Sequence, residues 1–184
     1  MNSILELDAR LSNQMRVAEK PGALRAIAAF FAHSGDSWFW AIGLIALWLS
    51  GDSFWKEWAV VQLGSISVLA AMVLLIKFRV RRQRPVGEWG RIYRNTDPHS
   101  FPSGHSARAF LIATIAAGLG PAGLALALWI WAPLVGLARV AMGVHYLSDI
   151  VAGALLGILV ALIGLQIYPL LFDWLFIWSG LRLW

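Results

Sequence analysis

The sequence predicts an all-α fold, a polytopic transmembrane helical bundle of five or six spans with an N-terminal interfacial amphipathic helix. The 184 residues are 59% hydrophobic and only 14% charged, which is more apolar surface than one soluble core can bury. Apolar runs that approach the roughly 20 residues of a membrane span recur along the chain. Tryptophans near the ends of these runs are typical of the two membrane interfaces.

Residues 1–20 are predicted to contain the interfacial helix. Its apolar residues recur at spacings of three and four, with charged residues between them: Ile4, Leu7, Leu11, Met15 and Ala18. The acidic residues and the lack of an apolar core argue against a cleaved signal peptide. Pro21-Gly22 ends this helix. A short apolar stretch follows at residues 23–31 and stops at the polar run 33–37, so the sequence leaves five or six spans open.

Five further apolar runs are predicted to span the membrane. They cover residues 38–49, 58–75, 107–119, 122–137 and 150–167. Gly153 and Gly157 predict close helix packing in the last of them. Because consecutive spans alternate in direction, residues 79–105 and 139–148 are expected at the same face of the membrane. The chain is predicted to be a single domain over residues 1–184.

Composition limits the chemistry of the chain. It has no cysteine, which excludes disulfides, thiolate metal ligands and a cysteine nucleophile. Seven of its 15 basic residues fall in a short cluster: Lys77, Arg79, Arg81, Arg82, Arg84, Arg91 and Arg94. The cluster fits a cytoplasmic anchor, a contact with anionic headgroups or a phosphate site. Nucleic acid is not an expected partner, because the cluster adjoins an apolar span and lacks an aromatic platform for stacking bases.

Lys77 and Arg84 are the first candidate pair. If the helix that contains Lys77 continues past its apolar run, two turns carry the cations about 10 Å apart on one face. Pro85 would then end the helix, with Arg84 in its last turn. A planar guanidinium and a mobile ammonium together suit a tetrahedral anion. The alternative is that these cations simply flank a span, which is our interpretation of Arg79 and Arg82.

The second candidate lies directly before the apolar run that starts at residue 107. Ser103 is predicted to cap that helix, with Gly104 and His105 in its first turn. Backbone N–H groups at a helix start favour anions, and glycine lets a ligand approach the backbone closely. His105 would stand beside the bound anion as a general acid. The alternative is an interfacial histidine next to an ordinary cap.

Arg139, His145 and Asp149 form the third candidate. His145 and Asp149 are four residues apart, close enough on a helical turn to face one another. A carboxylate on one imidazole nitrogen would leave the other nitrogen for nucleophilic attack. Asp149 also suits an N-terminal helix charge after Ser148, and the two roles do not exclude each other. Arg139 would be costly at a lipid-facing position.

The three candidates together resemble the three-part signature of the type 2 phosphatidic acid phosphatase superfamily, in its short bacterial form. The resemblance covers residues 77–149 and rests on Lys77 with Arg84-Pro85, on Pro102-Ser103-Gly104-His105, and on Arg139 with His145 and Asp149. It implies an integral membrane phosphatase that acts on a lipid through a phosphohistidine, with neither a metal nor another cofactor.

The resemblance also implies a role for each residue. The residues that hold phosphate are Lys77, Arg84, Ser103, Gly104 and Arg139. His145 attacks phosphorus, Asp149 orients it, and His105 protonates the leaving alkoxide before activating water. Ala138 replaces the serine that the superfamily commonly has there, so a weaker phosphate contact is expected.

The charges agree with this interpretation. A phosphomonoester carries about −1.5 to −2 at neutral pH, and Lys77, Arg84 and Arg139 supply three positive charges. Besides Asp149, the two loops contain the carboxylates Glu88 and Asp97, too few for a two-metal site. We therefore expect activity that survives chelators.

The expected partners are a phosphorylated membrane lipid and the bilayer itself, and the sequence leaves a homo-oligomer open. Substrate candidates are phosphatidic acid, phosphatidylglycerophosphate, an isoprenoid diphosphate such as undecaprenyl diphosphate, and a lipid A type glycolipid. Two other hypotheses are a vanadate-dependent haloperoxidase and a non-catalytic protein that binds or transports lipid phosphates. The membrane character argues against the first. Both histidines and Asp149 argue against the second, because binding needs neither a nucleophile nor a general acid.

The orientation in the membrane presents a conflict. The resemblance implies a bacterial inner membrane protein whose active site faces the periplasm or exterior. Lysine and arginine counts instead assign the active-site face to the cytoplasm. We favour the exterior, because phosphate binding accounts for Lys77, Arg84 and Arg139. If residues 23–33 cross, the N-terminal cations lie in the cytoplasm and the conflict shrinks.

Overall fold

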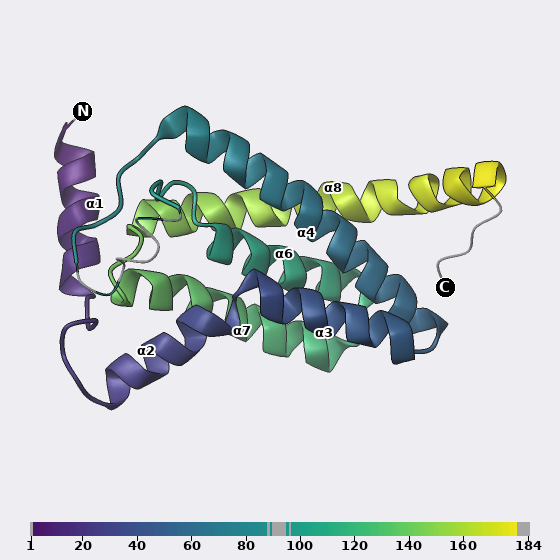
Figure 1. Cartoon of the computed structure of the whole chain (residues 1–184), viewed down its shortest axis with the longest axis horizontal. Helices are drawn as coiled ribbons and strands as arrows, with labels where there is room; N and C mark the ends of the chain where they lie inside the picture. The colour runs from purple at the N-terminus through teal and green to yellow at the C-terminus, as the bar shows by residue number, and fades with distance from the viewer. Residues whose placement is uncertain (1, 88, 90–94, 96, 180–184) are drawn as a thin grey trace.

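The computed structural model describes residues 2–87, 89, 95 and 97–179, and the regular elements of these residues are α-helices. In chain order they are α1 (Asn2–Gln14), α2 (Ala23–Ser34), α3 (Ser37–Ser50), α4 (Ser53–Val80), α6 (Gly104–Leu119), α7 (Ala122–Ala141) and α8 (Leu147–Ser179). Figure 1 shows α2 to α8 running along one elongated bundle, with α1 across one end. The predicted all-α bundle is confirmed.

Helix α6 lies at the centre of the bundle. Its Leu111 and Ile112 are fully buried, and it packs against α4, α7 and α8. Helix α8 approaches it closely because a glycine faces the α6 backbone. A Cβ added to Gly157 would lie 2.0 Å from the carbonyl oxygen of Ala107, closer than any real contact. The predicted close packing at this glycine is confirmed, and it fixes the position of α8 against α6.

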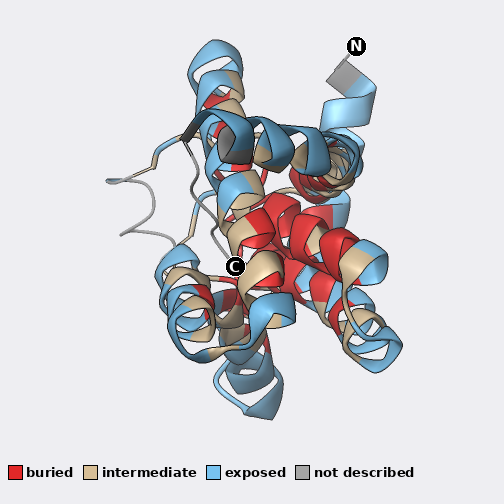
Figure 2. Cartoon of the chain, turned by 90° about the vertical axis from the view of Figure 1, so that its right-hand side faces the viewer, coloured by how far each residue is buried: buried red, intermediate tan, exposed pale blue. Residues whose placement is uncertain are grey.

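The outside of the bundle is apolar. Figure 2 shows the buried residues gathered inside and the exposed ones along the outer faces. Large apolar side chains such as Leu75, Leu126 and Leu155 are mostly exposed, as expected for a surface that meets lipid. Among the described residues, three helices are long and apolar enough to cross a membrane: Ser53–Val80, Ala122–Ala141 and Leu147–Trp174. Helix α6 is shorter than these three, with 16 residues, and lies buried inside the bundle.

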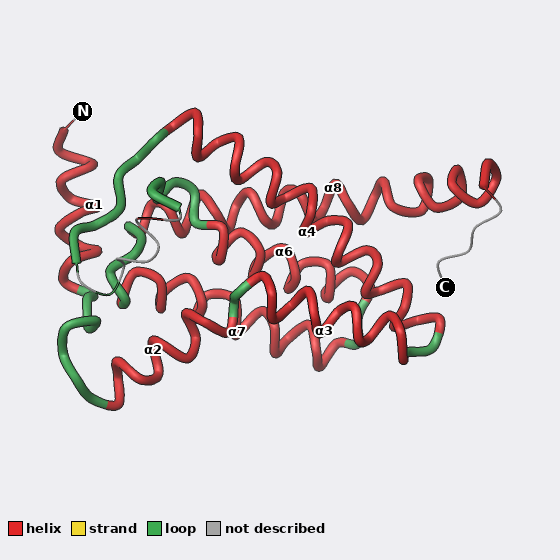
Figure 3. The backbone as a smooth tube through the Cα atoms, in the orientation of Figure 1, coloured by secondary structure: helices red, strands yellow, loops and turns green. Residues whose placement is uncertain are grey.

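Helices α2 and α3 are shorter apolar helices that follow one another. Figures 1 and 3 show them continuing in the same general direction, with a break at Gly35-Asp36, rather than doubling back. Helix α1 therefore lies at the same end of the bundle as the loops that follow α4 and α7. The N-terminal cations lie at that end too, since Arg16 Nη1 donates to the carbonyl oxygen of Val86 at 2.6 Å.

The course of the chain after α4 corrects one prediction. The helix ends at Val80, where Arg81 adopts a left-handed conformation with φ of 54°. Arg84 is therefore not in the last turn of this helix, and Pro85 does not end it. The chain continues in an extended conformation, with an antiparallel bridge between Gln83 and His99. The extended course lets the following arginines reach other elements, which a continued helix would not allow.

Helix α1 is amphipathic as predicted, but both of its faces are in use. Ile4 and Leu7 are exposed, in keeping with an interfacial helix. On the other face Ser12 is buried, and its Oγ accepts a hydrogen bond from the backbone N–H of Leu147 at 2.9 Å. Asp8 Oδ1 accepts another from the N–H of Ser148 at 3.1 Å. Helix α1 thus caps the N-terminus of α8.

Candidate active site

A cavity of about 370 Å³ lies among the ends of the central helices and the loops beside them. It brings together predicted site residues from four parts of the chain: Lys77, Arg84, Gly104, His105, Arg139 and His145. One wall is apolar and comes from α4, with Leu69, Val73 and Leu74. Leu74 is also about half exposed on the outer face of the bundle. The cavity therefore has a charged end and an apolar side next to the lipid-facing surface.

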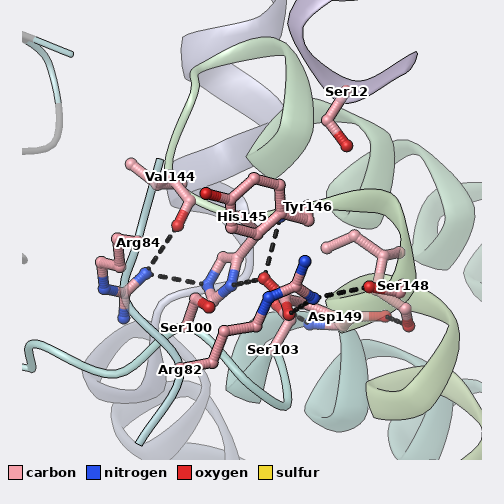
Figure 4. A network of polar contacts seen from close by, with 12 residues as sticks. Ser12, Arg82, Arg84, Ser100, Ser103, Val144, His145, Tyr146, Ser148 and Asp149 are labelled. Atoms are coloured by element: carbon pink, nitrogen blue, oxygen red, sulfur yellow. Dashed lines mark hydrogen bonds and ion pairs between the residues drawn. The ribbon is translucent and has the colours of Figure 1, made fainter. Parts of the chain in front are cut away.

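His145 and Asp149 lie in contact where the loop after α7 enters α8. His145 Nδ1 is 3.5 Å from Asp149 Oδ2, and the two side chains are only 1% and 0% exposed (Figure 4). Asp149 Oδ2 also accepts the backbone N–H of Tyr146 at 2.8 Å. The carboxylate thus lies at ion-pair distance from the imidazole, without a hydrogen bond at Nδ1 to any described residue, and also serves the start of the helix.

The other ring nitrogen of His145 faces the cations. Its Nε2 lies 3.1 Å from Arg84 Nη1, a hydrogen-bonding distance. Burial lowers the pKa of His145 well below its ordinary value, and the positive charges of Arg84, Arg139 and Lys77 lower it further. The imidazole is therefore neutral at pH 7, with Asp149 at one nitrogen and the cationic end of the cavity at the other.

A carboxylate already bridges two of the cations. Arg84 Nη2 donates to Asp97 Oδ2 at 2.9 Å, and Lys77 donates to the same oxygen. Arg84 is also fixed by two backbone oxygens, with Nε 2.7 Å from that of Asp97 and Nη1 2.9 Å from that of Val144. From the sequence, Asp97 was expected to matter only as a carboxylate available to a metal site. Its carboxylate instead marks where these cations hold an anion.

Ser103 caps α6 as predicted, with its Oγ accepting from the N–H of Ser106 at 3.4 Å. Gly104, in the first turn, lines the cavity, whereas Ser103 is fully buried behind it. Arg139, in the last turn of α7, is also fully buried and lines the cavity. Ala138 is not among the lining residues. It packs instead in an apolar cluster with Ala28 and Ala32 of α2.

Arg82 contacts the site from behind, which its interpretation as a flanking charge did not predict. Its Nη1 donates to Asp149 Oδ1 at 2.8 Å and to Ser148 Oγ at 2.6 Å (Figure 4). Its Nη2 donates to Asp8 Oδ2 at 2.7 Å. The guanidinium also stacks over the Tyr146 ring, 4.0 Å from its centre. Arg82 thus connects α1 to the carboxylate behind His145.

His105 has a partner that was also missed. Its Nε2 lies 2.8 Å from Asp36 Oδ1, in the turn between α2 and α3. The polar run 33–37 was interpreted only as the end of an apolar stretch. No local spacing could have revealed this contact, because the two residues are 69 positions apart.

Three residues that the sequence singled out, Glu88, Arg91 and Arg94, lie outside the described residues. Within the described part of the chain, no three His, Cys, Asp or Glu side chains gather as metal ligands would. Asp97, another carboxylate of this loop, forms ion pairs with the side chains of Lys77 and Arg84.

Comparison with known proteins gives consistent matches. The family model described as the PAP2 superfamily matches residues 58–173. A decaprenylphosphoryl-5-phosphoribose phosphatase of Mycobacterium tuberculosis is 36% identical over 160 residues, covering 83% of this chain and 84% of that protein. A probable lipid phosphate phosphatase beta of Arabidopsis thaliana is 28% identical over 89% of both chains.

Solved structures share the fold. The crystal structure of LpxE from Aquifex aeolicus has a TM-score of 0.69 and 29% identity, covering 88% of this chain and 94% of that one. A PAP2 type phosphatidylglycerolphosphate phosphatase from Bacillus subtilis also has a TM-score of 0.69, at 22% identity and over 92% of this chain and 88% of that one. The second likeness bears on the fold alone.

Proposed function

The chain belongs to the PAP2 superfamily, and we propose that it removes phosphate from a membrane lipid through a phosphohistidine formed on His145. The observation that carries this proposal is the arrangement around that imidazole. Asp149 lies at Nδ1, while Nε2 faces the cavity end that holds Arg84, Lys77 and Arg139. A nucleophile backed by a carboxylate and aimed at an anion site is suited to attack on phosphorus.

The reaction has two steps. In the first, Nε2 of His145 forms a bond to phosphorus while the bond from phosphorus to the lipid oxygen breaks, and that oxygen takes a proton from His105. In the second, His105 removes a proton from water, whose oxygen attacks the phosphohistidine and releases inorganic phosphate. The bond from phosphorus to Nε2 breaks in this second step, so the two steps together return His145 and His105 to their starting states.

The cations stabilise the charge that develops on phosphorus. Three oxygens of the transferring group share negative charge, and positioned donors stabilise it best in a site shielded from water. Arg84, Lys77 and Arg139 supply those donors, assisted by the Gly104 backbone and by Ser103, which fixes the start of α6. Asp97 must leave its cations when phosphate binds. No step needs a metal ion, so activity should persist in EDTA. Activity that is lost in EDTA and restored by added divalent ions would contradict this mechanism.

We infer the substrate class from the apolar wall and from the relatives. Leu69, Val73 and Leu74 adjoin the cations, so the tail of a lipid can lie on α4 while its phosphate meets His145. The Mycobacterium tuberculosis relative is named for an isoprenoid-linked sugar phosphate, and a relative from Porphyromonas gingivalis, 31% identical over 64% of this chain, is named a lipid A 1-phosphatase. We therefore favour a phosphate on an isoprenoid-linked or glycolipid carrier of the bacterial envelope over phosphatidic acid.

The test is phosphate release in detergent from a panel of lipid phosphates. The panel contains an isoprenoid phosphosugar, undecaprenyl diphosphate, a lipid A type glycolipid, phosphatidylglycerophosphate and phosphatidic acid. His145→Ala should reduce release from the best substrate by at least about 10³-fold, as expected for loss of a nucleophile. Equal release by the variant and the wild type would show that the mechanism is wrong. Binding of these lipids without any release would instead favour a binding or transport protein.

We also propose that the site faces the exterior of the inner membrane. Contacts within the site account for more of the basic cluster than expected, since Arg82 binds Asp149 in addition to the roles of Lys77, Arg84 and Arg139. Cations engaged in this way should not be counted as cytoplasmic anchors.

A further inference from the structure

The turn between α2 and α3 contacts the candidate general acid directly. Gly35 and Asp36 separate the two helices, and Asp36 Oδ1 lies 2.8 Å from His105 Nε2. The two side chains are 18% and 17% exposed, so water screens their interaction only partly. The second carboxylate oxygen, Oδ2, lies 3.2 Å from Nδ1 of His33. The turn therefore places an acceptor behind one nitrogen of His105.

We propose that Asp36 is a positioning residue for the general acid, holding the proton of His105 Nε2 so that Nδ1 exchanges the catalytic proton. This inference rests on the proposed function. When His105 is charged, Nε2–H donates to Asp36 and Nδ1–H is given to the leaving oxygen. When it is neutral, the same Nε2–H bond persists and Nδ1 accepts the proton from water. The carboxylate thus fixes one tautomer through both steps.

Several other donors hold the turn in place. Arg108, one turn after His105 on α6, donates from Nε to the Gly35 carbonyl oxygen at 3.0 Å and from Nη1 to Ser37 Oγ at 2.6 Å. Trp40 Nε1 donates to the Ser34 carbonyl oxygen at 3.0 Å, and Trp131 Nε1 of α7 donates to Ser34 Oγ at 2.9 Å. A turn that merely joined two helices would not need to be fixed to both α6 and α7.

The charges around His105 make such a partner necessary. Burial lowers the pKa of His105 well below its ordinary value, and the charges of Arg139 and Arg108 lower it further, while Lys77 and Arg84 line the same cavity. These cations disfavour the protonated imidazole that a general acid requires, and Asp97 is already paired with two of them. Burial raises the pKa of Asp36, but its hydrogen bonds with His105 and His33 outweigh this and bring the pKa to about 2. Asp36 is therefore an anion at neutral pH and favours the charged imidazole.

The test compares two leaving groups in the full-length protein. An alkyl lipid phosphate needs a proton on its departing oxygen, whereas 4-nitrophenyl phosphate releases a stable phenolate. For Asp36→Asn we expect kcat/KM to fall about 10- to 100-fold on the lipid, a share of the effect of general acid catalysis. On the aryl phosphate it should fall by less than about three-fold. The basic limb of kcat/KM for the lipid should also move to lower pH, because the amide no longer stabilises the imidazolium.

Two further variants make the outcomes distinct. Asp52→Asn is the matched control, because Asp52 precedes α4 as Asp36 precedes α3 but lies at the other end of the bundle, and both activities should persist. Equal loss of both activities in Asp36→Asn would show a merely structural role and overturn the inference. His145→Ala should abolish both activities. If it does not, the proposed function itself fails, whatever Asp36→Asn shows.

Discussion

Asp97 is the residue whose charge competes most directly with a bound phosphate. It shares one carboxylate oxygen between Lys77 and Arg84 and is itself 39% exposed. Lys77 and Arg84 are buried, but water screens the pairs through the partly exposed carboxylate, so we take the value of a screened pair, about 1 kcal/mol, which corresponds to a factor of about five in binding. We therefore predict that vanadate, a phosphate mimic, inhibits Asp97→Asn at about five-fold lower concentration than the wild type.

Titration of phosphate release with vanadate measures this effect. Asp52→Asn, at the other end of the bundle, should leave inhibition unchanged. Weaker inhibition of Asp97→Asn would mean that the carboxylate serves mainly to hold the two cations in position.

His145 predicts where activity fails in acid. Its pKa is lowered by burial and by the neighbouring cations, so the neutral nucleophile persists as pH falls below the ordinary histidine value of about 6.5. The acidic limb of kcat/KM should therefore lie below that pH. The second pKa of the substrate phosphate is about 6, so two substrates with different phosphate pKa values are needed. A limb common to both, at or above pH 6.5, would contradict a nucleophile held neutral by its surroundings.

The structure brings most of the predicted motif residues to one cavity, and two of the local patterns among them were visible in the sequence. His145 lies four residues from Asp149, and Gly104 and His105 follow the cap Ser103 directly. The supporting residues Asp36 and Asp8 were not predicted. Their contacts cross 69 and up to 140 positions, and such pairs leave no periodic signal in the sequence.

At the scale of elements, the contact between α1 and α8 can be tested through Asp8. Its carboxylate accepts the N–H of Ser148 and binds Arg82. Burial raises the pKa of Asp8, but the hydrogen bonds with Ser148 and Arg82 outweigh this and bring the pKa below its ordinary value. The group is therefore ionised at neutral pH. Asp8→Ala removes a helix cap, which typically costs about 1 kcal/mol. We predict a lower unfolding temperature in detergent and a several-fold lower kcat, because Arg82 loses one of its anchors beside Asp149.

Thermal unfolding and phosphate release on the same preparations check this prediction. Glu6→Ala is the matched control, since Glu6 is an exposed acidic residue of the same helix. Equal effects of the two substitutions would show that the charge of α1, rather than its contact with α8, is what matters.

The helices themselves were predictable from apolar runs and from Pro and Gly positions, but their ends were less so. The run before Lys77 predicted α4 correctly, yet not its end at Val80. Local propensity would allow the arginines that follow to remain helical. Their tertiary contacts with Asp149 and Asp97 require an extended chain, and a single sequence does not reveal such contacts.

At the scale of the whole molecule, the bundle places α1 and the active site at one end. Single cysteines at Asn13 and Asn95 should therefore react together with an impermeant thiol reagent in intact cells, since the chain has no other cysteine. Ser53 begins α4 at the opposite end of the bundle, so Ser53→Cys should react only after permeabilisation. Reaction of Asn13→Cys and Asn95→Cys from different sides would contradict the placement of α1. Reaction of both only after permeabilisation would place the active site in the cytoplasm.

The cap that α1 provides to α8 has a consequence for biosynthesis. Asp8 lies 140 residues before its partner Ser148, so α1 is made long before the helix that it caps. Lys77 and Arg84 likewise precede His145 in the chain, so the cavity that they line together is completed only when the loop before α8 has been made. Until the last span inserts, Asp8 and Ser12 have no helix to cap. The contact between α1 and α8 can therefore form only after α8 has been made, so this cap is completed late in biosynthesis.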